Sequence, residues 1–210
     1  MARPASDIRE RLIVAARARF LLEGVDGAAL RQIAKDAGTN IGMVYYYFKT
    51  KDELFLAVVQ DVYGGLLTDI DRAFGGEGSE EERFGALYQR LSRLSDAEFA
   101  VVRLVLREAL VSSTRLAELG QLFFRGHIPI VMRCLVEGIA QQRLRSDLSP
   151  ILLLVSSLVL GFMPQVAQRL VLSSQALPPA LQQQVPKPEE VARGLASILM
   201  HGIKYSERSD

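Results

Sequence analysis

Residues 40–51 of this 210-residue chain carry the side chains whose types and spacing best suit a chemical task. Tyr45, Tyr46 and Tyr47 follow one another, and each combines an apolar ring with a hydroxyl group that can reach a phosphate. Gly42 has no side chain, so a helix that carries it can approach another molecule closely. Successive residues of a helix point about 100° apart, so the three rings cannot all lie in a core. We therefore expect part of this surface to bind a partner.

Two short helices joined by a tight turn are expected to position these residues. The first helix has apolar residues at i, i+3, i+4 and i+7, namely Leu30, Ile33, Ala34 and Ala37. Gly38 supplies the left-handed residue that ends such a helix, and Asn40 is a suitable N-cap for a second helix that runs through Val44 and Phe48 and stops near Thr50. Thr50 and Glu53 fit the capping box at the start of a longer helix. This arrangement predicts a helix-turn-helix.

The second helix of such a motif enters the major groove of DNA, where its first turns meet the base edges. Its outward surface would consist of Asn40, Ile41, Gly42, Met43, Tyr45 and Tyr46. Ile41 and Met43 cannot form hydrogen bonds with bases, but they can pack on thymine methyl groups. The pattern favours double-stranded DNA as the partner.

The segment IAKDAG followed by GMVYYYFKTKDEL resembles the DNA-binding signature of the TetR family of transcriptional regulators, over roughly residues 8–58. The resemblance implies groove and backbone contacts at Ile41, Gly42, Met43, Tyr45, Tyr46, Tyr47 and Lys51. It also implies that Arg31 reads a guanine through a bidentate contact. The chain departs from the family at Ala29, where Thr or Ser usually caps the helix and binds a phosphate; Asp26 is the alternative cap.

Charge is distributed unevenly along the chain. Residues 1–52 hold nine Lys and Arg against six Asp and Glu, a net charge of +3, whereas the remainder holds 16 against 18, a net charge of −2. A basic head on a slightly acidic body suits a protein that meets nucleic acid with one end. The hydrophobic fraction of 49% and the charged fraction of 23% are those of a folded protein.

The sequence offers little support for an enzyme. Its two histidines, single cysteine and lack of HExxH or GxSxG leave neither a metal cluster nor a supported nucleophile, and no catalytic residue, metal site or cofactor is predicted. The GGEG stretch at 75–78 lacks the lysine and hydroxyl of a phosphate loop, so it is expected to be a connector. The alternative to a regulator is a helical interaction protein with a degenerate DNA-binding head.

Helical periodicity continues through the rest of the chain, which predicts an all-α protein of about nine helices. We expect a DNA-binding domain at residues 1–50 and a helical ligand-binding and dimerisation domain at 51–210. Capping boxes at Ser79 and Ser95 start two of the helices. One long helix is expected from about Leu116 to Arg143, with a bend at Pro129. The Ser-, Gln- and Pro-rich segment 173–186 is expected to be an exposed loop.

The segment between Asp147 and Arg169 has no charged residue and is long enough to span a membrane. Serines, prolines and glutamines lower the hydrophobicity of this segment. We therefore interpret it as a buried helix at a subunit interface, and we predict no interaction with a membrane. The charged N-terminus lacks the apolar core of a signal peptide, and Cys134 has no second cysteine with which to form a disulfide. These features predict a cytoplasmic protein.

The family resemblance further implies a small-molecule effector in the body and a homodimer formed by the last two helices, at about 149–172 and 188–202. Both helices are apolar over more than one face, which favours a four-helix interface with a twofold mate and a near-palindromic operator. The candidate pocket residues, each also suited to an ordinary core, are Tyr88, Phe99, Arg103, Phe123, Phe124, His127, Val131, Phe162 and Met163. The sequence leaves open whether Arg103, Arg107 and Arg133 surround an anionic ligand.

Overall fold

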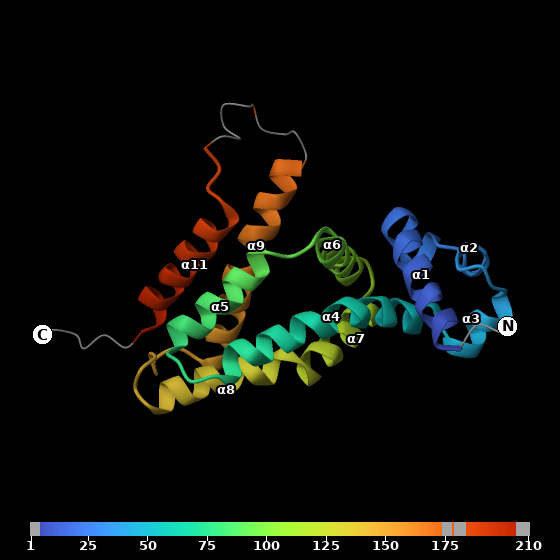
Figure 1. Cartoon of the computed structure of the whole chain (residues 1–210). Helices are drawn as coiled ribbons and strands as arrows, with labels where there is room; N and C mark the ends of the chain where they lie inside the picture. Colours follow the sequence, from blue (N-terminus) through green and yellow to red (C-terminus); the bar gives the residue numbers. More distant parts are fainter. Residues whose placement is uncertain (1–4, 174–177, 179–183, 205–210) are drawn as a thin grey trace, which may run out of the picture. The chain divides into compact units, whose positions relative to one another are not determined.

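The computed structural model describes residues 5–173, 178 and 184–204 (Figure 1). Within these residues the chain forms ten α-helices and no β-strand, apart from an isolated bridge between Leu144 and Lys204. The all-α prediction is confirmed, with ten helices where about nine were expected. Most of the loop predicted at 173–186 lies outside the described residues.

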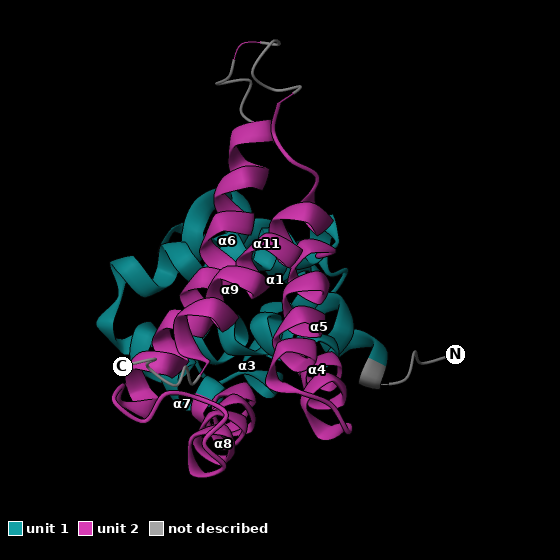
Figure 2. Cartoon of the chain, turned by 90° about the vertical axis from the view of Figure 1, so that its left-hand side faces the viewer, with its two compact units in different colours: residues 1–66, 95–123 teal, residues 67–94, 124–210 magenta. Residues whose placement is uncertain are grey.

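The chain divides into two compact units, coloured separately in Figure 2. Unit 1 comprises residues 1–66 and 95–123, and unit 2 comprises residues 67–94 and 124–210. The first part of α4 (Lys51–Gly75) and most of α7 (Ser113–Arg125) belong to unit 1, together with α1 (Ala5–Gly27), α2 (Leu30–Asp36), α3 (Ile41–Tyr47) and α6 (Asp96–Val111). Unit 2 holds the end of α4 and the helices α5 (Glu80–Ser92), α8 (His127–Ala140), α9 (Pro150–Ser173) and α11 (Pro188–Ile203). The functional boundary expected at residue 50 stays a prediction.

Local capping chemistry sets the start of several helices as predicted. The Ser79 hydroxyl accepts a hydrogen bond from the Glu82 N–H at 3.3 Å, while the Glu82 carboxylate accepts from the Ser79 N–H at 2.8 Å. Ser95 and Glu98 form the same reciprocal pair at the start of α6. These bonds satisfy backbone donors that the first turn of a helix leaves unpaired.

The single long helix expected from Leu116 to Arg143 is wrong, because the structure has two helices there. Helix α7 ends at Arg125, Gly126 has a non-helical backbone (φ −108°, ψ −114°), and α8 begins at His127. Pro129 therefore lies in the first turn of α8, where its missing N–H would have had no partner inside the helix. The chain breaks at the glycine, and the proline is accommodated without a bend.

Each unit has its own core. In unit 1, α1 packs against α2, α3 and α6, and the fully buried side chains of these helices include Leu12, Phe20, Ile33, Val44 and Leu104. In unit 2, α5 packs against α9 and α11, and Tyr88 of α5 is fully buried with its hydroxyl donating to the carbonyl oxygen of Ser157 at 2.6 Å. Gly161 of α9 permits this contact, since a Cβ there would lie 2.1 Å from the Tyr88 ring.

Helix α9 contains a segment, Pro150–Leu172, that is long and apolar enough to cross a membrane by length and composition. One third of its most apolar window is buried within the protein. A single helix of this kind is weak evidence for a membrane span, since core and interface helices meet the same criteria.

Candidate DNA-binding surface

The turn between α2 and α3 has the geometry that the sequence predicts. Gly38 is left-handed (φ 64°), and its N–H donates to the Lys35 carbonyl at 3.0 Å. The Thr39 N–H donates to the Ala34 carbonyl at 2.9 Å, which completes a Schellman motif. Asn40 then caps α3, because its Oδ1 accepts from the Met43 N–H at 3.2 Å. Local sequence chemistry therefore fixes both ends of the turn.

Helix α3 presents two of its tyrosines to solvent. The exposed fraction is 59% for Tyr45 and 76% for Tyr46, whereas Val44 is fully buried against the rest of the motif. Tyr47 is half-buried, and its ring meets that of Tyr46 edge-on with centroids 5.0 Å apart. Among the other predicted contact residues, Arg31, Asn40 and Gly42 are exposed, and Ile41, Met43 and Lys51 are half-buried. This outward arrangement is the one that a helix needs in order to enter a groove.

Gly42 leaves open space on the outer face of α3. A Cβ at this position would meet only the Asn40 Oδ1, at 3.0 Å. A larger residue would therefore press on the oxygen that caps the helix, besides covering the bare backbone. Close approach to a partner and an undisturbed cap both favour glycine here.

Lys51 lies at the start of α4, next to a helix end that attracts anions. Its ammonium group donates to the backbone carbonyl of Asp26 at 2.9 Å. The Thr50 hydroxyl accepts from the Glu53 N–H at 3.0 Å, as the predicted cap requires. The Glu53 carboxylate accepts from the Lys49 N–H at 2.7 Å, one residue before the position that a capping box uses.

Two arginines of α1 contact the C-terminal end of α2. Arg11 donates to the Ala37 carbonyl at 2.7 Å, and Arg19 pairs with Asp36 at 2.6 Å. The hydrogen bond from Arg19 holds the pKa of the Asp36 carboxyl below its ordinary value. Both contacts hold α1 against the C-terminal end of α2, and they therefore stabilise the helix-turn-helix.

Asp26 does not cap α2 in the way that the sequence suggested. The N-cap position is Ala29, which makes no side-chain capping bond. The Asp26 carboxylate instead accepts two hydrogen bonds from Arg115 of α7, at 2.9 and 2.8 Å. These bonds lower the pKa of the Asp26 carboxyl. Asp26 binds Arg115 because a charge-assisted hydrogen bond between two ionised groups is stronger than a bond from its carboxylate to a backbone N–H of α2.

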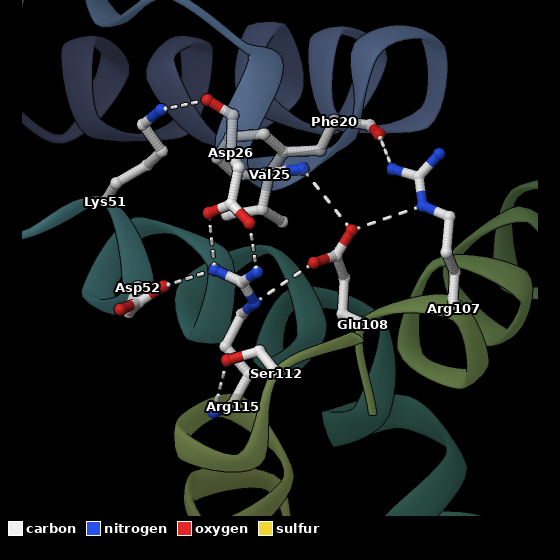
Figure 3. Close-up of polar contacts among 9 residues, drawn as sticks. All are labelled: Phe20, Val25, Asp26, Lys51, Asp52, Arg107, Glu108, Ser112 and Arg115. Atoms are coloured by element: carbon white, nitrogen blue, oxygen red, sulfur yellow. Dashed lines mark hydrogen bonds and ion pairs between the residues drawn. The ribbon is translucent and has the colours of Figure 1, made fainter. Parts of the chain in front are cut away.

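Arg115 is the centre of a group of charges that we call the Arg115 cluster, consisting of Asp26, Asp52, Glu108 and Arg115 (Figure 3). The side chains of Arg115 and Glu108 are about 95% buried, and their ion pair spans 3.0 Å from Nε to Oε2. Sequence reasoning missed this cluster. The available signal was a charged pair, Arg107 and Glu108, in an otherwise apolar stretch of α6.

The predicted pocket residues are divided between the units. In unit 1, Phe99 is buried, Phe123 packs edge-on against Tyr63 at 5.5 Å, and Arg103 is exposed. Arg107, which the sequence left open as a ligand contact, binds the Phe20 carbonyl at 2.7 Å.

In unit 2, Tyr88 and Val131 are fully buried, and His127 and Phe162 are half-buried. Burial lowers the pKa of His127 to about 4. Phe124 and Met163 are exposed, as is Arg103 of unit 1, so these three candidate pocket residues do not lie in the interior of their units. Their placement on outward helix faces is a better fit to a surface than to a pocket.

Comparison with known proteins identifies the family. A family model described as bacterial regulatory proteins, tetR family, matches residues 12–58. The uncharacterized HTH-type transcriptional regulator TtgW of Pseudomonas putida is 33% identical over 98 residues, which are 47% of this chain and 73% of TtgW. The chain belongs to the tetR family of bacterial regulatory proteins. The family resemblance expected from the sequence is confirmed.

Other similar proteins are matched over shorter segments or at lower identity. The HTH-type transcriptional repressor NicS of Pseudomonas putida is 37% identical over 62 residues, which are 30% of this chain and 29% of NicS. Several further curated relatives are likewise matched over less than two thirds of their own length. The fold is that of FadR from Bacillus subtilis, solved in complex with stearoyl-CoA, with a TM-score of 0.71 at 17% identity over 92% of this chain and 98% of that one. The matched relatives are transcriptional regulators, not enzymes.

Proposed function

We propose that this protein is a ligand-responsive transcriptional repressor, which binds a near-palindromic operator as a homodimer and is released by a small molecule. The observation that carries the proposal is the outer face of α3, where Tyr45 and Tyr46 project into solvent beside the bare backbone of Gly42. A capped helix with this surface suits the major groove. Arg31 is assigned to a guanine, and Lys51 to a phosphate at the start of α4.

The homodimer is supported by an exposed apolar face of α9. Its exposed apolar residues recur every four positions, at Ile151, Val155, Val159 and Met163, and Ile198 of α11 is also exposed. Residues at this spacing share one side of a helix. A second copy of α9 and α11 would cover them in a four-helix interface, and the twofold symmetry would present two α3 helices to two half-sites.

The effector is proposed to be a small molecule bound in the helical body. Support comes from two similar proteins: FadR of Bacillus subtilis, which has a similar fold, was solved in complex with stearoyl-CoA, and the relative NicS is a transcriptional repressor. An effector causes the protein to release DNA only if it binds more tightly to the conformation that cannot bind DNA than to the conformation that can. We propose that this difference displaces α4 and moves the two α3 helices out of register. A regulator of this kind acts in the cytoplasm, where it meets DNA.

The test begins with duplexes selected from random DNA by the wild-type protein. Titration of the selected duplex should show that Arg31→Ala costs about 1–3 kcal/mol at one base position and relaxes preference there. Lys51→Ala should weaken binding to all DNA sequences by a similar factor and reduce the slope of log affinity against log salt concentration by about 1. Arg133→Ala, which removes an exposed arginine from unit 2, serves as the control.

Two results would contradict the proposal at different levels. Unchanged affinity and base preference in Arg31→Ala would show that the role given to Arg31 is wrong. Failure of the wild-type protein to select any duplex in a salt-dependent manner would reject DNA binding. That second result would favour a helical interaction protein with a degenerate head.

A further inference from the structure

A break in α1 leaves backbone groups that α6 must satisfy. Gly24 has φ 82° and ψ 165°, so the chain leaves the helical path there. The N–H of the next residue, Val25, donates to the Glu108 carboxylate at 3.3 Å. The carbonyl of Phe20, in the turn before the break, accepts from Arg107 at 2.7 Å. Two neighbouring residues of α6 thus supply one acceptor and one donor to the end of α1 (Figure 3).

The Glu108 carboxylate, which accepts the hydrogen bond from Val25, is itself buried and needs a cationic partner. Glu108 is 3% exposed, and Arg115, its partner at 3.0 Å, is 4% exposed. Removing one member of a buried ion pair leaves an uncompensated charge, which is strongly destabilising. The Glu108–Arg115 pair therefore fixes the start of α7 relative to α6 and the end of α1.

The rest of the Arg115 guanidinium faces two carboxylates of the DNA-binding head. Nη1 donates to Asp26 Oδ1 at 2.9 Å and to Asp52 Oδ1 at 3.0 Å, and Nη2 donates to Asp26 Oδ2 at 2.8 Å. Asp26 follows the break in α1, and Asp52 lies in the first turn of α4. One planar group thereby joins α1 and α4, a task for which the fork geometry of arginine is suited.

Lys51 is the DNA-binding candidate that depends on this joint. It is the neighbour of Asp52, and its ammonium group binds the Asp26 backbone carbonyl at 2.9 Å. Asp26 is therefore held by two hydrogen-bond donors: Arg115 binds the Asp26 carboxylate, and Lys51 binds the Asp26 backbone carbonyl. If the side-chain bonds are lost, the carbonyl that locates the Lys51 side chain is no longer fixed.

We propose that Arg115 is a positioning residue for DNA binding, which holds Asp26 and Asp52 together and so pre-orders Lys51 and the start of α4 for the operator. The inference rests on the proposed function and adds to it the place where α6 and α7 act on the DNA-binding head. Holding a binding group in its bound geometry raises affinity, because less freedom is lost on binding. Arg115 itself is buried and acts only through the two aspartates.

Two isosteric variants, Asp26→Asn and Asp52→Asn, test the proposal without emptying the buried site. Both side chains reach the surface, with exposed fractions of 73% and 36%, so the variants are expected to fold. Each change removes a negative charge near the DNA, which by simple electrostatics would leave binding unchanged or strengthen it. A positioning role predicts the opposite sign, a loss of about tenfold in affinity for the selected duplex.

The matched control is Asp61→Asn, which removes a carboxylate of α4 that pairs with Arg17 at 3.6 Å, outside the Arg115 cluster. It should bind as the wild type does. A second readout is a double-mutant cycle in which Lys51→Ala is made in the wild-type and Asp26→Asn backgrounds. If Arg115 acts through Lys51, the loss caused by Lys51→Ala becomes smaller in the Asp26→Asn background.

Binding is compared at a temperature where circular dichroism shows every variant folded. Lower affinity of both aspartate variants, together with a non-additive cycle, would support the proposal. Unchanged or stronger binding, or losses that add independently, would overturn it and leave the Arg115 cluster a purely structural feature. A wild-type protein that selects no duplex would instead defeat the proposed function, and this inference with it.

Discussion

The partly buried histidine of unit 2 gives a prediction for the pH dependence of stability. Burial lowers the pKa of His127 from its ordinary value of 6.5 to about 4. The folded protein therefore binds this proton less readily than the unfolded chain does. The resulting stability is fully present above pH 6.5 and is lost as the pH falls toward 4.

The magnitude follows from the size of the shift. A difference of one pKa unit corresponds to about 1.4 kcal/mol, so the free energy of unfolding should fall by about 3 kcal/mol between pH 7 and pH 4 through His127 alone. Replacement by leucine removes the titrating group. The His127→Leu variant should therefore lose about 3 kcal/mol less than the wild type over the same range.

Urea unfolding at a series of pH values, with protein concentration held constant, measures this difference. Constant concentration matters because association contributes to apparent stability. His201→Gln is the matched control, because it replaces the other histidine of the chain, whose side chain is exposed on α11. Parallel profiles for the wild type and His127→Leu between pH 7 and pH 4 would refute the assignment of a neutral, partly buried imidazole.

Three further substitutions test separate parts of the structure. Gly161→Ala places a Cβ within 2.1 Å of the Tyr88 ring, so thermal unfolding should show a loss of at least about 1–3 kcal/mol; an unchanged melting temperature would mean that the ring is free to move. Asn40→Ala removes the cap on the Met43 N–H and should cost about 1 kcal/mol in the same assay, and no loss would show that the cap contributes nothing. Val155→Asp places a charge on the exposed face of α9 and should yield monomers in sedimentation at a concentration where Val111→Asp, which changes another exposed valine, in α6, stays dimeric; an intact Val155→Asp dimer would place the interface elsewhere.

The features that the sequence predicted well depend on nearby residues. Asn40 caps α3 through a bond to a residue three positions away, and the boxes at Ser79 and Ser95 operate over the same distance. Gly38 takes the left-handed conformation because glycine, which has no Cβ, adopts it at little steric cost. The exposure of Tyr46 follows from the helical period of its neighbours.

The features that were missed or misassigned depend on partners far along the chain. Asp26 was considered as a local cap, but Arg115, which lies 89 residues away, binds it. The charged pair Arg107 and Glu108 stands out in an apolar stretch of α6, but the local pattern does not identify the partners of Glu108, Val25 and Arg115. The two helices meeting at Gly126 were read as one because Pro129 is compatible with either a bend or a first helical turn, and only the packing of the chain decides between them.

The dependence of α1 on α6 has a consequence for building chimeric regulators. A graft that transfers only residues 1–50 to another body would leave the Val25 N–H and the Phe20 carbonyl without the partners that α6 provides. A transferable cassette should therefore carry residues 95–123 together with residues 1–66, the set that forms one compact unit. In such hybrids, the recipient scaffold would have to accept two separate stretches of donor sequence.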